Sequence, residues 1–169
     1  MKNIILIGFM GVGKGSTARE IVKQSNIVAI DTDDIIESME NRRIKRVFES
    51  EGEAYFRSLE KRVGIWLEES VRNTLISTGG GFYKVPNINK IGKVVLLHSS
   101  FDGIYKRIIN HPQADKKIKK RPLFAEFSKA KALYNERLPE YKKIADLIID
   151  VEGKSVEKVA AEILKKVKK

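Results

Sequence analysis

Cysteine is absent from the 169-residue sequence, and proline, histidine and tryptophan are scarce, with four, two and one copies. The lack of cysteine excludes a disulfide framework, a thiolate nucleophile and a cysteine-based zinc site. No apolar run approaches the about 20 residues of a membrane-spanning helix. Glycines interrupt the apolar N-terminal segment, which is not typical of a signal peptide. We therefore expect a cytoplasmic protein without a membrane segment, folded as one domain over residues 1–169.

Acidic residues are few in the second half of the chain. Residues 1–83 contain twelve basic and twelve acidic side chains. Residues 84–169 contain 21 basic and 10 acidic side chains and therefore carry the whole net charge of +11. Such an excess attracts anionic ligands, among them nucleic acid. However, the sequence has no zinc finger and no basic stripe interleaved with aromatic residues. We therefore expect small anionic ligands rather than nucleic acid, and most lysines on a solvated surface.

Short apolar segments alternate with helical patterns along the whole chain. The apolar runs predict strands at about 3–7, 27–30, 74–77, 93–97 and 147–150. The segments between them predict helices at 13–24, 33–40, 44–50, 53–71, 101–109, 128–144 and 155–168. This alternation predicts an α/β fold with a parallel sheet, in which ligands bind at the carboxyl ends of the strands.

A glycine-rich segment follows the first predicted strand. Residues 8–16 read GFMGVGKGS, which is close to the phosphate-binding pattern G-x-x-x-x-G-K-[ST]. The glycines allow backbone N–H groups to surround an anion, and the next helix directs the positive end of its dipole at the same point. A tight turn without a ligand is the alternative. The pattern favours ATP binding by Gly11, Val12, Gly13, Lys14, Gly15 and Ser16.

The position after Lys14 departs from this pattern. It holds Gly15, where a Ser or Thr hydroxyl ordinarily ligates Mg²⁺, and the first hydroxyl comes one residue later, at Ser16. One residue turns a helix by about 100°, so Ser16 need not point to the same place. Three possibilities stay open: the metal is held through water and other groups, Ser16 substitutes for the missing hydroxyl, or metal binding is weakened.

Carboxylates follow the second predicted strand, in the segment Asp31-Thr32-Asp33-Asp34. Beside a phosphate site, one carboxylate can hold Mg²⁺ through water and another can accept the proton of an attacking hydroxyl. The alternative is that these residues only cap the next helix. Both interpretations stay open for each residue of the segment.

Two further segments suit an anionic substrate. Gly79-Gly80-Gly81 follows the third strand and lets a ligand approach the backbone closely, although a plain flexible loop is the alternative. Arg57 and Glu60 stand three residues apart on one predicted helix face. A Glu in this position can orient the guanidinium of the Arg toward a substrate carboxylate. A surface ion pair is the simpler interpretation.

A long basic segment separates the helix after the fourth strand from the next helix. Residues 110–123 predict a polar loop, and loops of this length in compact domains are usually lids or disordered. A lid over about 110–124 that carries Arg121 can close over a triphosphate, add positive charge and exclude water from the transferring phosphoryl group.

Taken together, the motifs resemble those of shikimate kinases along nearly the whole chain. The resemblance rests on residues 8–16, Asp31-Thr32-Asp33, Phe56-Arg57 with Glu60, Gly79-Gly80-Gly81, Arg121-Pro122-Leu123, and Arg137 with Pro139 and Tyr141. It implies a three-layer α/β/α fold of the P-loop, nucleoside-monophosphate-kinase type. The implied fold has a five-stranded parallel sheet, a substrate subdomain at about 32–62 and a mobile lid. The implied reaction transfers the γ-phosphate of ATP to the 3-hydroxyl of shikimate, with Mg²⁺ as cofactor.

The resemblance also implies roles for individual residues. Lys14 and Arg121 match phosphate-binding catalytic residues, Asp33 matches the carboxylate that contacts shikimate and takes the proton, and Asp31 matches the carboxylate near Mg²⁺. The residues that match the shikimate pocket are Asp33, Phe48, Phe56, Arg57, Gly79, Gly80, Gly81 and Arg137. Beyond the glycine-rich segment, the resemblance implies further ATP contacts at Arg107, Arg121 and Lys154. Gly15 is the main departure from the family pattern.

Two other functions fit parts of the sequence. Gly15 favours an adenylate-kinase-like or other small-metabolite kinase, but Asp31-Thr32-Asp33 and Phe56-Arg57 argue against it. A non-catalytic nucleotide- or nucleic-acid-binding protein would explain Gly15 and the charge. Such a protein would have no need of Asp33, Arg57, Arg121 and Arg137. We expect a monomer, because the sequence shows neither a heptad pattern nor an apolar interface patch.

Overall fold

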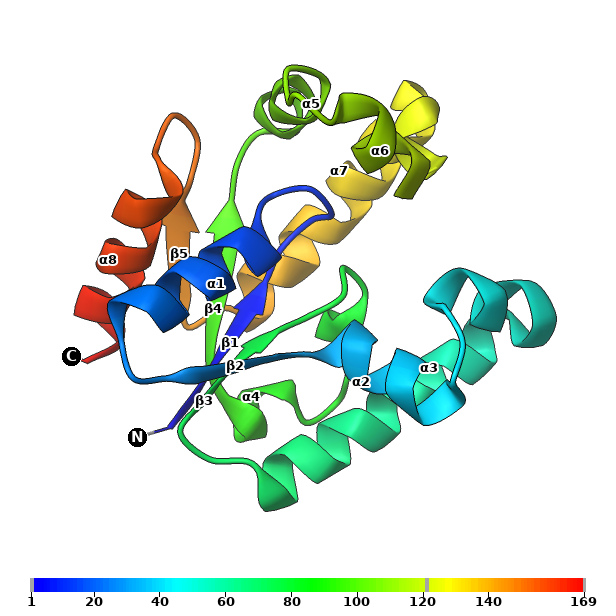
Figure 1. Cartoon of the computed structure of the whole chain (residues 1–169). Helices are drawn as coiled ribbons and strands as arrows, with labels where there is room; N and C mark the ends of the chain where they lie inside the picture. Colours follow the sequence, from blue (N-terminus) through cyan, green and yellow to red (C-terminus); the bar gives the residue numbers. More distant parts are fainter. Residues whose placement is uncertain (1, 121, 169) are drawn as a thin grey trace.

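A five-stranded sheet forms the centre of the computed structural model, which describes residues 2–120 and 122–168 (Figure 1). The strands are β1 (Asn3–Ile7), β2 (Val28–Asp31), β3 (Thr74–Ser77), β4 (Gly92–His98) and β5 (Leu147–Asp150). They are all parallel and lie in the order β2-β3-β1-β4-β5. The prediction of a five-stranded parallel sheet is confirmed.

The central strand β1 is buried along its whole length, because helices cover both faces of the sheet. Its one polar side chain is fully hydrogen-bonded. The amide of Asn3 donates to the carbonyl oxygens of Val71 (2.8 Å) and Ile91 (3.0 Å), and its oxygen accepts from the N–H of Thr74 (3.1 Å). A buried asparagine therefore ties together the segments that enter β3 and β4, without leaving a polar group unsatisfied.

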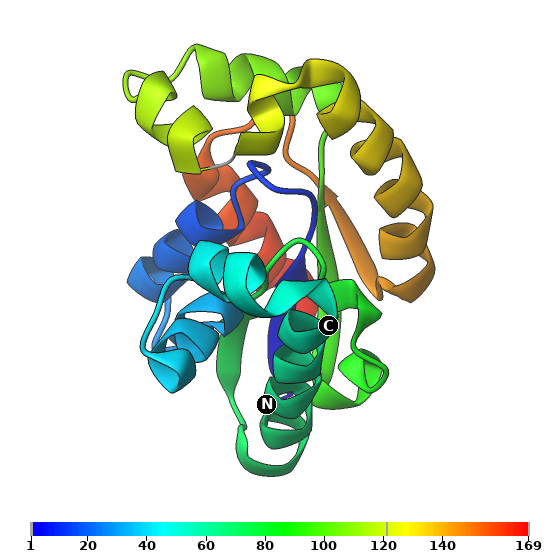
Figure 2. The same cartoon turned by 90° about the vertical axis from the view of Figure 1, so that its right-hand side faces the viewer.

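Helices lie on both faces of the sheet. The α-helices are α1 (Lys14–Gln24), α2 (Thr32–Glu40), α3 (Ile44–Ser70), α4 (Ile88–Ile91), α5 (Phe101–Ile109), α6 (Ala114–Lys120), α7 (Phe127–Ile144) and α8 (Val156–Val167). Two short 3-10 helices, η1 (Phe82–Lys84) and η2 (Pro122–Ala125), complete the set within the described ranges. Helices α1 and α8 pack together on one face, and α4 and α7 lie on the other (Figures 1 and 2). This is the expected three-layer α/β/α arrangement. Within the described ranges, no helix is long and apolar enough to cross a bilayer.

The structure differs from the sequence-based prediction in the basic segment. Residues 110–123 were expected to form a loop, but they include α6 and the start of η2, so this expectation is wrong. The physical reason is that α6 has a single large apolar residue, Ile118, which is half-buried against the core, so the segment shows no apolar stripe. The helices predicted at 44–50 and 53–71 are both present within α3, where Gly52 interrupts the helical dihedrals (φ 84°, ψ 176°).

Candidate active site

The glycine-rich loop connects β1 to α1 at the carboxyl edge of the sheet (Figure 1). Gly8, Gly11 and Gly13 have φ values of 146°, 83° and 105°, which residues with a side chain rarely adopt. At Gly8 a Cβ atom would also lie 2.7 Å from the carbonyl oxygen of Leu97. The loop conformation therefore requires glycine at these positions.

Lys14, the first residue of α1, folds back over this loop. Its Nζ donates to the carbonyl oxygens of Gly8 (2.6 Å) and Phe9 (3.2 Å). The ammonium group is thus held above the loop, where the N-terminus of α1 also attracts an anion. The loop and Lys14 therefore lie side by side, and phosphate binding by them stays a prediction.

A cavity of about 440 Å³ opens beside the loop, and we call it the phosphate cavity. The predicted site residues that line it are Gly11, Gly13, Lys14, Gly15, Ser16, Asp31, Asp33, Gly79, Gly80 and Arg107. The lining residues to which the sequence assigned no role are Met10, Arg19, Ser77, Thr78, Ile108, Gln113, Lys116 and Lys117. Five of the lining residues are cationic and two are carboxylates, so the cavity suits a polyanion.

A second cavity of about 440 Å³ adjoins the first. The residues that line both are Gly11, Ser16, Arg107 and Lys117. Two other predicted ATP ligands, Val12 and Lys154, line only the second cavity. The guanidinium of Arg107 donates to the carbonyl oxygen of Val12 (2.8 Å), and Lys154 is paired with Glu162 (2.8 Å). The predicted ATP ligands within the described ranges therefore line two adjoining cavities. Arg121 lies outside the described residues.

Two aspartates of the carboxylate segment have different environments. Oδ1 of Asp31 accepts from the backbone N–H groups of Asp33 (2.9 Å) and Asp34 (3.4 Å), so Asp31 caps α2 as the alternative interpretation proposed. Oδ1 of Asp33 is buried and has no hydrogen-bond partner within the described ranges. Burial raises the pKa of Asp33 to about 7, with further contributions from the charges of Asp31 and Glu60 and an opposing one from Lys14. Asp33 is therefore a carboxyl group poised to exchange a proton near neutral pH.

The glycine turn 79–81 brings three of the predicted substrate ligands together. A Cβ atom on its first glycine would lie 2.6 Å from Oδ1 of Asp33, and one on its second glycine would lie 3.0 Å from a guanidinium nitrogen of Arg137. A Cβ atom on the third glycine would overlap the guanidinium of Arg57. The turn is thus contacted by one carboxylate and two guanidinium groups, which come from α2, α7 and α3.

Arg57 is held by carboxylates on its own helix. It lies 2.5 Å from the nearly fully buried Glu60 and 3.3 Å from the exposed Glu53. Its guanidinium carbon also lies 5.5 Å from the ring centroid of Phe56, which in turn packs against the ring of Phe48 at 4.6 Å. Burial raises the pKa of Glu60, and the hydrogen bond from Arg57 opposes this change. These contacts fix the direction of the guanidinium beside an aromatic wall.

Two residues that support the glycine turn were not among the predicted site residues. The buried hydroxyl of Tyr141 donates to the carbonyl oxygen of Gly80 (2.5 Å), and burial raises the pKa of Tyr141 to about 12. The hydroxyl of Thr32 accepts from the N–H of Gly79 (3.2 Å). Each contact joins residues more than 40 positions apart, so no local sequence pattern could have revealed it.

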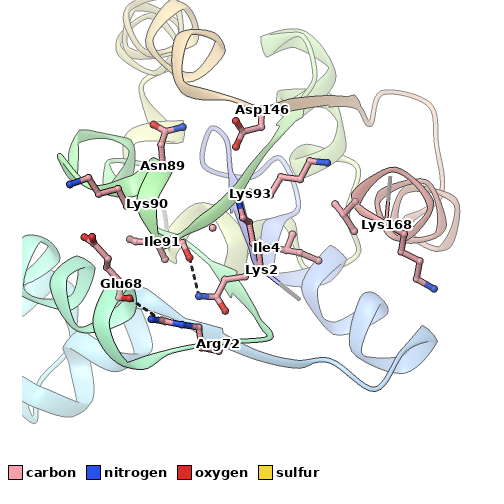
Figure 3. Close-up of a pocket in the computed structure, with 13 residues that line it drawn as sticks. Lys2, Ile4, Glu68, Arg72, Asn89, Lys90, Ile91, Lys93, Asp146 and Lys168 are labelled. Atoms are coloured by element: carbon pink, nitrogen blue, oxygen red, sulfur yellow. Dashed lines mark hydrogen bonds between the residues drawn. The ribbon is translucent and has the colours of Figure 1, made fainter.

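A cavity of about 680 Å³, larger than the two adjoining cavities, lies at the opposite edge of the sheet (Figure 3). Several lysines line it, but the side chains of Lys90, Lys93 and Lys168 point in different directions in Figure 3. Its Asp146 accepts from the backbone N–H of Val94 (2.7 Å). Because these lysines do not converge on one point, this cavity is a weaker candidate than the phosphate cavity.

Comparison with known proteins agrees with this geometry. The family model for shikimate kinase matches residues 10–168. The shikimate kinase of Helicobacter hepaticus is 42% identical over 157 residues, which cover 93% of this chain and 91% of that protein. A shikimate kinase structure from Acinetobacter baumannii in complex with shikimate is 29% identical and superposes with a TM-score of 0.83, covering 99% of this chain and 93% of the other. The Aquifex aeolicus shikimate kinase structure is 34% identical and superposes with a TM-score of 0.78, covering 98% of this chain and 96% of the other. The chain therefore belongs to the shikimate kinase family.

Proposed function

We propose that this chain transfers the γ-phosphoryl group of ATP to the 3-hydroxyl of shikimate. The observation that carries the proposal is the convergence of Asp33, Arg57 and Arg137 on the glycine turn at the edge of the phosphate cavity. Two guanidinium groups suit a carboxylate, and an aspartate accepts hydrogen bonds from hydroxyls. Shikimate carries one carboxylate and three hydroxyls. An AMP acceptor would instead need phosphate contacts and a slot for adenine.

The nucleotide is proposed to lie across the two adjoining cavities. Its phosphates bind the glycine-rich loop and Lys14 in the phosphate cavity, while its base extends toward Lys154 in the second cavity. Arg107, which lines both cavities, lies between these parts of the ligand. Arg121 is proposed to reach the phosphates from the lid at about 110–124. Phe48 and Phe56 are proposed to cover the shikimate ring.

Asp33 is proposed to act as the general base. Its Oδ1 accepts the proton of the 3-hydroxyl as the hydroxyl oxygen attacks the γ-phosphorus, and ADP leaves. A pKa of about 7 leaves Asp33 partly ionised at neutral pH and able to hold the transferred proton. Lys14 stabilises the negative charge on the phosphate oxygens, since phosphoryl transfer depends mainly on positioning and charge stabilisation.

The residues present fit a magnesium ion that is held mostly by water and phosphate oxygens. Asp31 and Asp33 both line the phosphate cavity, and no group of three or more acidic or histidine ligands exists within the described ranges. Proteins commonly bind Mg²⁺ through one or two carboxylates together with substrate phosphates. We propose that Asp31 holds the ion through water, with Ser16 as a second candidate. When bound, the ion would neutralise charge on the phosphates.

The proposal is tested by ADP release from ATP and Mg²⁺ in the presence of shikimate, AMP or no acceptor. ADP release that requires shikimate supports the proposed function. ADP release with AMP as the only effective acceptor would assign the chain to the nucleotide kinases. ATP binding without release in any condition would favour the non-catalytic alternative. All the proposed ligands belong to one chain, so we also propose that the monomer is active, which light scattering under assay conditions can test.

A further inference from the structure

Gly15 is not required by the backbone of α1. Its φ is not among the positive values found at Gly8, Gly11 and Gly13. A Cβ atom at Gly15 would meet only one neighbour within 4 Å, a guanidinium nitrogen of Arg19 at 3.5 Å, which is an ordinary contact. The helix could therefore accept serine at this position. The glycine therefore removes a hydroxyl from the first turn of the helix, while the guanidinium of Arg19 lies beside the same position.

Arg19 lies one helical turn after Gly15 and lines the phosphate cavity. Its guanidinium donates to the hydroxyl of Ser16 (3.4 Å), so it points back toward the N-terminus of α1. Its side chain is exposed, and within residues 2–120 and 122–168 it forms no ion pair with a carboxylate. A cation that lines a phosphate site without a carboxylate partner can bind an anionic ligand without first breaking an ion pair.

The position that Arg19 faces has a defined role in other P-loop proteins. There, the Ser or Thr after the P-loop lysine ligates the Mg²⁺ that bridges the β- and γ-phosphates. In this chain, no side chain occupies that position, and a guanidinium lies against it instead. A guanidinium carries a fixed positive charge and a planar donor fork that matches phosphate oxygens.

We propose that Arg19 binds the β- and γ-phosphate oxygens across Gly15 and replaces part of the charge neutralisation that a hydroxyl-bound Mg²⁺ supplies elsewhere. This inference rests on the proposed use of ATP. Its consequence is that nucleotide binds this protein with only a weak dependence on Mg²⁺. The other cations that line the same cavity are Lys14, Arg107, Lys116 and Lys117, and they add to the same effect.

The test is calorimetric titration of ATP into the full-length protein, with excess Mg²⁺ and, separately, with EDTA. For Arg19→Ala, we expect the metal-free dissociation constant to rise about tenfold, the loss typical of one charge-assisted contact. The value measured with Mg²⁺ should change less. Lys23→Ala is the matched control, because Lys23 is an exposed cation on the same helix that does not line the phosphate cavity. It should change metal-free binding less than twofold, within the small effect expected of a distant surface charge.

Gly15→Ser provides the reciprocal measurement. It should raise the ratio of the metal-free to the Mg²⁺-bound dissociation constant, because it restores a hydroxyl for the ion beside the guanidinium. Circular dichroism and thermal unfolding confirm that each variant is folded.

Two results would overturn the inference. One is equal weakening of metal-free binding by Arg19→Ala and Lys23→Ala, and the other is a wild-type protein that binds ATP only with Mg²⁺. Shikimate-dependent ADP release by the wild type at saturating Mg²⁺ tests the proposed function separately, because it can succeed when either of these results is found.

Discussion

The guanidinium of Arg57 lies 2.5 Å from the carboxylate of Glu60, whose side chain is only 2% exposed. The other oxygen of Glu60 is buried and has no hydrogen-bond partner within the described ranges. Such a buried pair is weak evidence for added stability, because desolvation of both charges offsets much of their attraction. Its contribution is instead directional: it holds the guanidinium of Arg57 beside the glycine turn where substrate is proposed to bind.

Glu60→Gln should therefore weaken shikimate binding more than it slows turnover. Without the charge of Glu60, Arg57 loses its main orienting partner, and we expect KM for shikimate to rise about tenfold, equivalent to about 1.4 kcal/mol, with a smaller change in kcat. Steady-state kinetics with varied shikimate measure this. Glu53→Gln is the comparison, because Glu53 contacts the same arginine but is 61% exposed. Equal effects of the two substitutions would contradict an orienting role for Glu60.

Asp33→Asn should abolish most of the turnover. An amide cannot accept the hydroxyl proton, and general-base catalysis typically contributes about 10²- to 10⁴-fold. The affinity for ATP should remain near that of the wild type, because the loop and Lys14 are unchanged. Single-turnover rates and calorimetry separate the two quantities. A rate within about threefold of the wild type, against this expected loss, would remove Asp33 from the role of base.

The same substitution should stabilise the protein at alkaline pH. The pKa of Asp33 is raised from 3.8 to about 7, so between these values the folded state binds more protons than the unfolded state. Stability therefore decreases as pH rises through this window, by at most about 4 kcal/mol. Asp33→Asn removes this penalty. Its melting temperature should exceed that of the wild type at pH 8 by more than it does at pH 5, and a constant difference would contradict the raised pKa.

Gly79→Ala should disturb catalysis through Asp33. The added methyl group would lie 2.6 Å from Oδ1 of Asp33, so the carboxylate or the turn must move. We expect at least a tenfold loss of kcat, since small misplacements of catalytic groups have large effects on rate. Gly52→Ala is a useful control, because Gly52 lines neither of the two adjoining cavities and its Cβ atom would meet nothing within 4 Å, although its φ of 84° adds backbone strain. A fully active and folded Gly79→Ala protein would show that this contact is dispensable.

Local sequence was enough to predict much of the fold. The strands are short apolar runs because the sheet is covered on both faces, and the structure confirms their positions within one or two residues. The loop after β1 was predictable for a similar reason, since its positive φ values demand glycine at defined positions. The motifs also identified the family, because phosphate binding and carboxylate recognition need particular residue types.

The sequence was less informative where structure depends on distant contacts. Ile118 is the one large apolar residue in the sequence of α6, so its helical form left no periodic signal. The contact between Tyr141 and the carbonyl of Gly80 joins α7 to the turn after β3, and no pattern of neighbours predicts it.

The residues along the chain specify which chemical groups this protein possesses and the order of its strands and most of its helices, because local periodicity and backbone requirements are encoded by neighbouring residues. How these groups are arranged around one site depends on the tertiary structure. The pKa of Asp33 is raised by burial and by the charges of Asp31 and Glu60, and the charge of Lys14 opposes this change. The convergence of Arg57 and Arg137 on one turn, and the approach of Arg19 to Gly15, depend on side-chain packing that neither spacing nor composition specifies.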